Sequence, residues 1–311
     1  MKLSDLKAGS NTKQTLLLPV ASPYPVEITA ICGSQPGKTL IVTAGIHGCE
    51  YVGIEALNRL KKELDPSGLS GRVILLLLVN PEGFYMGAKQ TIPADGQNLN
   101  RMFPGDPAGT FSSRFAKILE KVLYPEADFL MDLHGGDINE ALTPLIFFPA
   151  AVPDTLAAKT SAAAAALSVP YRVASTSKNG LYSWAAQCGI PSLLVERGER
   201  GLWSENEITA CKRNVFELMD HLKIKTFSNT AFHQEEIRQS IYEEAPINGF
   251  WYPAVSHAGQ KLKQGALLGT LKDFYGNEIF RYTAPFDGVI LYYTLSLGVK
   301  YKDPLIAYGR I

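Results

Sequence analysis

The stretch TAGIHGCEYVGIEAL, residues 43–57, joins the end of an apolar run to the start of an amphipathic pattern. The apolar residues before Gly45 predict the end of a buried strand, and the later spacing predicts a helix over residues 50–64. Between the two lies His47-Gly48-Cys49-Glu50, which places an imidazole, a thiol and a carboxylate in one short turn. A strand-to-helix corner of an α/β protein is a common place for a ligand site.

The same alternation of strand and helix runs from residue 15 to about residue 222. Strands are predicted over residues 15–20, 26–33, 38–46, 72–80, 127–134, 143–150, 170–176 and 191–198. Helices are predicted over residues 50–64, 111–123, 154–167, 180–188 and 205–222. Several strands are apolar at consecutive positions, which indicates that helices cover both faces of the sheet. The pattern therefore predicts an α/β fold with a mixed, mostly parallel sheet flanked by helices.

The pattern of apolar and turn-forming residues changes after about residue 224. Residues 245–311 contain short apolar or aromatic runs separated by Gly or Asp-Gly, a pattern that predicts a small all-β unit. The polar segment 223–244 separates the α/β pattern from the all-β pattern. A length of 311 residues suits one large and one small domain. We therefore expect a catalytic domain over residues 1–224 and a small β domain with its linker over residues 225–311.

Composition excludes several classes of protein. The chain is 46% hydrophobic and 19% charged, with thirty basic and thirty acidic residues, which is ordinary for a globular enzyme. A net charge of zero argues against nucleic acid or an anionic membrane surface as the main partner. No apolar run approaches the ~18 residues of a membrane span, and the N-terminus shows no signal-peptide pattern. Four dispersed cysteines without a C-x-x-C pair indicate a reduced, cytoplasmic setting.

Two histidines and a glutamate form a candidate metal site. His47 and Glu50 can chelate one ion from the corner, and His134 ends the predicted strand 127–134 just before two glycines. A hydrolytic zinc site needs three protein ligands and one open position for water. Taken singly, H-x-x-E is a frequent chance pattern and His134 could be a structural histidine, but their shared position at strand ends favours a metal. Cys49 is expected to pack at the corner.

Two further segments carry side chains suited to substrate chemistry. Asn100 and Arg101 lie in a loop, where an amide donor and a planar guanidinium suit a carboxylate. Glu196 ends the predicted strand 191–198 and could serve as a general base. The alternatives are structural: Arg101 could pair with a local acid, and Glu196 with one of the arginines that follow it.

Five segments in a fixed order resemble the succinylglutamate desuccinylase/aspartoacylase family of the zinc-carboxypeptidase superfamily. They are GIHGCE, NPEGF, NLNRMFPG, DLHGG and LLVERG, and the resemblance covers roughly residues 38–220. It implies one Zn²⁺ per chain, held by His47, Glu50 and His134. It also implies that Glu196 is the catalytic base and that Asn100 and Arg101 bind the substrate carboxylate.

Three positions bear on the substrate that this resemblance implies. Tyr182, fourteen residues before Glu196, matches a substrate-contacting tyrosine of aspartoacylase-like members. Gln90, beside Lys89, stands where the family usually has an arginine that polarises the scissile carbonyl, so one of these two is expected to contact the oxyanion. Ala186 stands where some members carry an anion-binding arginine, which argues against a dicarboxylate such as N-acetylaspartate.

The C-terminal unit resembles the β domain of bacterial members, which is similar to a biotinyl/lipoyl hammerhead. DFYGNE, residues 273–278, occupies the expected hairpin, and no carrier-type lysine motif is found there. We therefore expect a lid or an assembly element, the latter within a homo-oligomer, and not a swinging arm.

These observations predict a zinc-dependent hydrolase that cleaves the amide bond of a small, anionic N-acyl amino acid. Two alternatives stay open at this point. One is a metallocarboxypeptidase that acts on a short peptide with the same metal and base. The other is a non-catalytic binding protein that has kept the fold.

Overall fold

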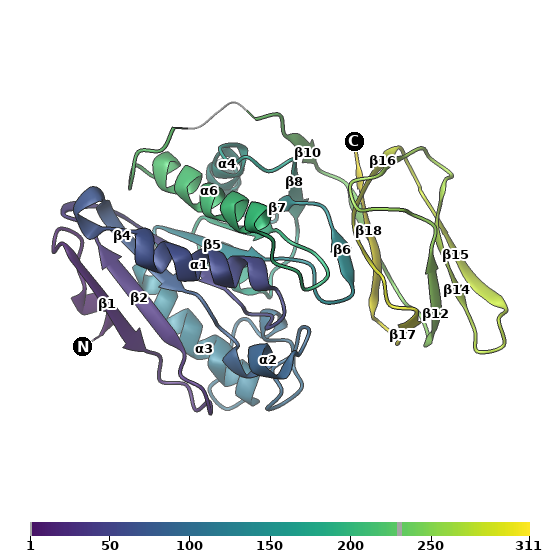
Figure 1. Cartoon of the computed structure of the whole chain (residues 1–311), viewed down its shortest axis with the longest axis horizontal. Helices are drawn as coiled ribbons and strands as arrows, with labels where there is room; N and C mark the ends of the chain where they lie inside the picture. The colour runs from purple at the N-terminus through teal and green to yellow at the C-terminus, as the bar shows by residue number, and fades with distance from the viewer. Residues whose placement is uncertain (1, 229–231) are drawn as a thin grey trace.

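The computed structural model describes residues 2–228 and 232–311 and places a nine-stranded sheet between two layers of helices (Figure 1). The order of the strands across this sheet is β1-β2-β4-β3-β5-β9-β7-β8-β10. The neighbours are parallel from β4 through β3 and β5 to β9 and again from β7 through β8 to β10, and antiparallel elsewhere. The predicted α/β class with a mixed, mostly parallel sheet is confirmed.

The strands of this sheet overlap the predicted ones but differ at their ends. They are β1 Thr12–Leu17, β2 Glu27–Cys32, β3 Gln35–Ala44, β4 Ser70–Leu76, β5 Phe129–His134, β7 Leu145–Pro149, β8 Tyr171–Ser175, β9 Ser192–Glu196 and β10 Glu235–Ile237. The strand β1 begins before the apolar run that predicted it, because Thr12 to Leu17 pair with Cys32 to Glu27 of β2.

The helices confirm the five predicted segments and add one short helix. They are α1 Tyr51–Glu63, α2 Pro81–Met86, α3 Phe111–Leu123, α4 Asp154–Ala165, α5 Leu181–Gln187 and α6 Glu205–His221. The short α2 was not predicted, since six residues that begin with Pro81 show no helical periodicity. Single 3₁₀ turns add Leu3–Asp5, Pro66–Gly68, Leu99–Arg101 and Tyr124–Glu126.

Alternate residues of the central strands enter two different cores, which explains the unbroken apolar runs. Leu40 and Val42 of β3 pack in the core shared with α1, α4 and α6, whereas Ile41 packs in the core shared with α3 and α5. The two central neighbours of β3 along the sheet alternate in the same way. Both faces of the sheet are therefore buried, as expected for parallel strands covered by helices.

Two antiparallel sheets form the C-terminal part of the chain (Figure 1). One contains β11 Ser240–Glu244, β18 Pro304–Arg310, β16 Gly288–Thr294 and β13 Lys261–Leu262. The other contains β15 Glu278–Thr283, β14 Leu267–Lys272, β12 Gly249–Pro253 and β17 Gly298–Val299. They enclose a core that includes the fully buried Trp251, so the predicted all-β unit is confirmed.

Each part of the chain lends one short strand to the other. The strand β6 Glu140–Leu142 leaves the α/β part and pairs with β16, and β10 returns from the predicted linker to pair with β8. A shared cluster contains Leu145, Tyr171 and Val173 on one side and Ile237, Val289, Leu291 and Ala307 on the other. Because the two parts exchange strands in this way, the division into domains at residue 224 stays a prediction.

Within residues 2–228 and 232–311, no helix has both the length and the apolar character needed to cross a bilayer.

Candidate active site

The corner after β3 is shaped by two glycines with different roles. Gly45 has a φ of 66°, in the left-handed region that glycine adopts without strain. At Gly48 the constraint is space, because an added Cβ would lie 2.3 Å from the backbone of Gly83 and Phe84 in α2. The corner therefore lies directly against α2, and α1 begins with Glu50 as its N-cap residue.

His47, Glu50 and His134 converge at this corner, and all three side chains are buried. The Nδ1 atom of His47 lies 2.6 Å from one oxygen of Glu50, and the Nδ1 atom of His134 lies 2.9 Å from the other. One potential ligand atom from each residue lies within 4.8 Å of the other two. The structure thus brings together the three residues predicted to hold a metal.

The far nitrogen of each imidazole is held by an acceptor oxygen. His134 Nε2 lies 3.0 Å from Asp132 Oδ2, and His47 Nε2 lies 3.2 Å from Asn98 Oδ1. These partners favour the tautomer with the proton on Nε2, which leaves a lone pair on each Nδ1. Two such lone pairs and a carboxylate then face one another, and a cation bound between them would interact favourably with all three. The donor set of two imidazoles and one carboxylate fits zinc.

The charges in this cluster shift one another's ionisation. Burial would raise the pKa of Glu50, but His47 and His134 outweigh it and lower the pKa to about 2. Burial would lower the pKa of His134, but Asp132 and Glu50 raise it well above its usual value. The raised pKa favours a protonated His134 in the absence of a metal, and a metal ion bound at its Nδ1 would displace that proton.

Glu196 lies beside the cluster of His47, Glu50 and His134 because of the strand register. It pairs with His134 between the parallel strands β5 and β9 and lines the same cleft. Its side chain is half-buried, and burial together with repulsion by Glu50 and Asp132 raises its pKa to about 8, against attraction by His134 and Arg101. A carboxylate with a pKa near neutrality is suited to both accepting and returning a proton.

The loop with Asn100 and Arg101 forms another wall of the cleft. Asn98 caps the 3₁₀ turn and accepts a hydrogen bond from the Asn100 backbone at 2.9 Å. The Asn100 side chain accepts from the Leu181 backbone at 2.8 Å, so it is fixed to the start of α5. Arg101 is exposed and donates to the Asn100 carbonyl at 2.9 Å. Within the described residues no carboxylate lies within ion-pair distance of Arg101, which leaves its charge available to a ligand.

Tyr182 and Gln90 also line the cleft, so all eight predicted site residues meet in it. The buried Tyr182 donates from its hydroxyl to Ser175 Oγ at 2.9 Å. Lys89, the alternative to Gln90, instead places its ammonium 3.6 Å from Asp137. Ala186 is fully buried in α5.

The side chains of Cys49 and Arg197, both next to residues of the site, have other partners. The Cys49 thiol donates to the Lys89 carbonyl at 3.3 Å, and burial, with repulsion by Glu50, raises its pKa to about 12. It therefore stays protonated and packs at the corner. Arg197 is buried and donates to Asn214 Oδ1 at 2.7 Å and to the Ser168 carbonyl at 3.0 Å. Neither of these side chains is among the cleft-lining residues.

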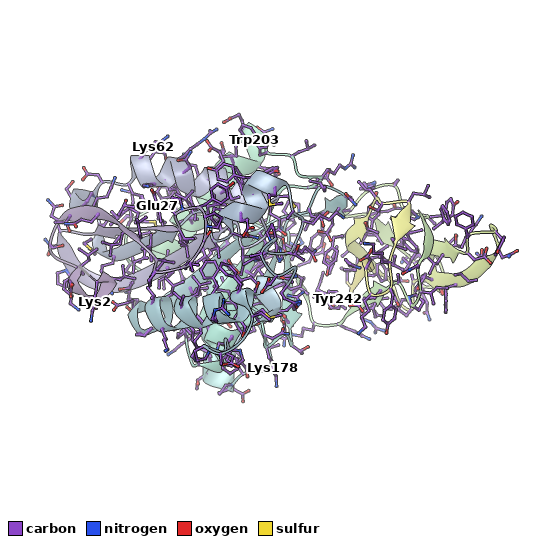
Figure 2. The ribbon with its side chains drawn as sticks, turned by 90° about the horizontal axis from the view of Figure 1, so that it is seen from below. Lys2, Glu27, Lys62, Lys178, Trp203 and Tyr242 are labelled. Carbon is purple, nitrogen blue, oxygen red and sulfur yellow. The ribbon has the colours of Figure 1, made fainter. Side chains whose placement is uncertain are left out.

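The cleft has a volume of about 820 Å³, and much of its wall was not predicted. Figure 2 shows Tyr242 of the C-terminal part where the two parts of the chain meet. The lining residues missed by sequence reasoning include Asn98, Glu140, Arg238, Tyr242, Glu243, Tyr292 and Lys302. Asn98 lies within the quoted NLNR segment, but the others carry no motif that would have singled them out.

Comparison with known proteins identifies a family that matches most of the α/β part of the chain. The succinylglutamate desuccinylase/aspartoacylase catalytic domain matches residues 36–222. An N-alpha-acetyl-L-2,4-diaminobutyric acid deacetylase from Halomonas elongata is 43% identical over 100 residues, which span 32% of this chain and 29% of that protein. A succinylglutamate desuccinylase from Pseudomonas paraeruginosa is 37% identical over 133 residues, spanning 40% of this chain and 39% of that protein.

A solved structure extends the likeness to nearly the whole chain. The crystal structure of a succinylglutamate desuccinylase/aspartoacylase from Rhodobacter sphaeroides has a TM-score of 0.84 at 26% identity. The superposition covers 96% of this chain and 95% of that one. The C-terminal sheets are therefore shared with that protein.

Proposed function

The chain belongs to the succinylglutamate desuccinylase/aspartoacylase family, and we propose that it is a zinc-dependent hydrolase of the amide bond in a small N-acyl amino acid. The observation that carries this proposal is the position of Glu196 next to His134, which puts a base with a near-neutral pKa beside a three-ligand cluster in one cleft. The cleft volume of about 820 Å³ is that of a small-molecule site.

Each of the eight predicted site residues has a role in this proposal. His47, Glu50 and His134 hold one zinc ion, which when bound supplies a Lewis acid for the amide carbonyl and makes a water more acidic. Arg101 receives the substrate carboxylate with its unpaired guanidinium. Tyr182 contacts the substrate and Gln90 donates to the carbonyl oxygen as negative charge develops there.

Glu196 moves the proton in both halves of the reaction. It accepts a proton from the attacking water, so that the oxygen can add to the acyl carbon. It then returns this proton to the amide nitrogen as the carbon–nitrogen bond breaks, and the free amine leaves. Asn100 keeps the Arg101 loop fixed to α5 and adds its amide to the carboxylate site.

The names of two relatives support a proposal for the acyl group and leave the amino acid open. The Halomonas protein is named for an acetyl group on a diamino acid, and the Pseudomonas protein for a succinyl group on glutamate. We propose an acyl group of this small size for the present chain. A cytoplasmic location and a homo-oligomeric state stay predictions.

Metal analysis and a substrate panel test this function. We expect one zinc per chain and hydrolysis of N-acetyl or N-succinyl amino acids, with slower or no cleavage of short peptides. The Glu196→Gln variant should keep its zinc and lose about 10²- to 10⁴-fold in kcat. The control is Glu199→Gln, which changes a nearby acid outside the cleft lining.

Three results would count against the proposal. If the Glu196→Gln variant has the kcat of the parent, Glu196 is not the general base. Cleavage of peptides in preference to N-acyl amino acids would favour a carboxypeptidase, and absence of stoichiometric zinc would favour a binding protein.

A further inference from the structure

Arg197 follows the proposed base directly, and its side chain lies on the opposite face of the sheet. Leu194 of β9 packs in the core shared with α3 and α5, and Val195 packs in the core shared with α1, α4 and α6. Side chains alternate along a strand. In keeping with this alternation, Glu196 lines the cleft, whereas Arg197 contacts α6, which covers the other face (Figure 1).

The guanidinium of Arg197 joins three segments of the chain. Its Nε donates to Asn214 Oδ1 of α6 at 2.7 Å, and its Nη2 donates to the Ser168 carbonyl, between α4 and β8, at 3.0 Å. A third bond of 3.2 Å runs from Nη1 to Glu207 of α6. Because a guanidinium is planar, these partners fix its orientation as well as its position.

The partners of Arg197 are themselves held in place. Glu217 of α6 accepts from the Ser168 backbone at 2.8 Å and from the Ser168 hydroxyl at 2.6 Å. The Asn214 amide donates to the same carboxylate at 2.9 Å. Arg197, Ser168, Asn214 and Glu217 are all buried, and together they form what we call the Arg197 network.

A charged network is not needed to fill this space. Ile208, Cys211 and Val215 of α6 are apolar and pack in the same core. Burial of charged groups costs free energy, and apolar side chains of similar volume often stabilise a fold at least as well. A fully hydrogen-bonded polar network instead makes the local structure rigid and unique. The Arg197 network is therefore suited to fixing the position of the segment that carries it.

That segment is the end of β9, where the proposed base lies. The pairing of β9 with β5 and with β7 ends at Glu196, opposite His134 and Leu145. The Arg197 backbone then donates to the His134 carbonyl at 3.0 Å, and Gly198, with a φ of 83°, turns the chain away. Since Gly198 has no side chain, Arg197 is the side-chain anchor closest to Glu196 on that side.

The carboxylate of Glu196 has no such anchor of its own. Within the described residues, no hydrogen bond or ion pair reaches it. Its place beside His134 therefore depends on the backbone that carries it. This dependence makes the contacts of the next residue important for the chemistry, although they lie on the far face of the sheet.

We propose that Arg197 is a positioning residue, which acts on the reaction through Glu196. The proposal rests on the proposed role of Glu196 as general base and adds how that base is held. The Arg197 network fixes the end of β9 to α6, so that the carboxylate stays at one distance from the cluster of His47, Glu50 and His134. A misplacement of about 1 Å can lower the rate of an enzyme about 10²-fold.

The first test is kinetic, on the zinc-loaded, full-length protein with an N-acetyl amino acid as substrate. Arg197→Met removes the guanidinium and keeps an unbranched side chain. We expect kcat to fall about 10- to 100-fold and KM to change less than about threefold, because the carboxylate site at Arg101 is untouched. Arg197→Lys keeps the charge without the planar fork, so it should recover part of the lost kcat.

Arg72→Met is the matched control. Arg72 is an equally buried arginine at the start of β4, away from the cleft, and it donates to Leu6, Thr39 and Glu126. Each substitution leaves buried polar partners without a donor, so both should lower the melting temperature. Only Arg197→Met should lower kcat, and Arg72→Met should stay within about twofold of the parent kcat.

The sharpest measurement repeats Arg197→Met in the Glu196→Gln background. If Arg197 acts through the base, its removal should lower the residual kcat of Glu196→Gln less than about twofold. A general loosening of the fold would lower kcat by the same factor in both backgrounds. Zinc content and melting temperature report whether each variant is folded. If Arg197→Met does not fold, Arg197→Lys takes its place in both backgrounds.

The outcomes separate this inference from the function on which it rests. A parent-like kcat in the folded Arg197 variant would overturn the positioning role. An equal loss of kcat in Arg72→Met, or equal losses in the two backgrounds, would overturn it as well. If Glu196→Gln keeps the kcat of the parent, or if the parent hydrolyses no N-acyl amino acid, the proposed function itself fails.

Discussion

His134 is held at both of its ring nitrogens, and these two contacts have different consequences. Nδ1 faces Glu50 at 2.9 Å and Nε2 faces Asp132 at 3.0 Å. Asp132 is itself fixed, because the Thr43 hydroxyl donates to its other oxygen at 2.6 Å across the β3–β5 register. The carboxylate of Asp132 thus sets which nitrogen of His134 carries the proton and which one is free for a metal.

Asp132→Asn tests this positioning role. An asparagine can still accept from Thr43, but its amide then donates toward Nε2 and favours the tautomer with the proton on Nδ1. We expect zinc affinity, measured by competition with a chromophoric chelator, to fall about 10- to 100-fold. Asp128→Asn is the matched control, because Asp128 accepts from the Thr39 backbone at 2.7 Å, away from the site. Unchanged zinc affinity in Asp132→Asn would contradict the prediction.

The residues of the candidate metal site were predictable because each one has a local signature. His47 and Glu50 share one turn, and His134 stands at a strand end before two glycines. Glu140 and Asn98 lack such a signature, since an acid or an amide in a loop is ordinary. Their positions depend on β6 joining another sheet and on a cap within one 3₁₀ turn, which a single sequence does not reveal.

Among the elements, α2 packs directly against the corner that carries His47 and Glu50. Its backbone at Gly83 and Phe84 fills the space next to Gly48. Its N-terminus is fixed by Asn80, whose side chain accepts from the Gly83 backbone at 2.8 Å and whose backbone donates to Gly45 at 2.8 Å. The corner that carries His47 and Glu50 therefore packs directly against α2.

Gly48→Ala tests that contact. The added methyl group would meet backbone atoms at 2.3 Å, so either the corner or α2 must shift. We expect the free energy of unfolding, measured in urea, to fall by about 1–3 kcal/mol, together with a loss of zinc affinity. Gly298→Ala, where an added Cβ meets nothing within 4 Å, should change it by less than about 0.5 kcal/mol. Equal stability of the two variants would refute the tight fit.

Long periodic elements were predictable, whereas short ones were not. The helices α1, α3 and α6 each have 13 residues or more and show their apolar stripe directly in the sequence. The strands β6 and β10 have three residues each, too few for a period of two to be recognised. Their pairing is decided by partners far along the chain.

At the scale of the whole molecule, the exchange of β6 and β10 joins the two parts into one structure. The shared cluster of Leu145, Tyr171, Val173, Ile237, Val289, Leu291 and Ala307 contains residues from both sides. The cleft is built from both parts as well. Separation of the parts would uncover this cluster and open the substrate site at once.

We therefore expect a single cooperative unfolding transition. Of the three tryptophans, Trp184 packs against the α/β core, Trp251 lies in the C-terminal core and Trp203 is exposed, so variants that keep Trp184 alone or Trp251 alone report on each part. Their thermal midpoints should coincide. Zinc at 100 times its Kd should add about 2.7 kcal/mol to the stability seen by both probes. Two separate midpoints, or a zinc effect on Trp184 alone, would contradict this expectation.

The strand exchange also sets an order of events during biosynthesis. Leu142 of β6 pairs with Tyr292, a residue made 150 positions later. At roughly 5–20 residues per second, a ribosome needs about 8–30 s to cover that distance. Once Glu196 has been made, the nascent chain holds the three proposed metal ligands and the proposed base, but it still lacks the C-terminal wall of the cleft. The proposed selectivity for a substrate therefore arises later in synthesis than the proposed ability to bind a metal.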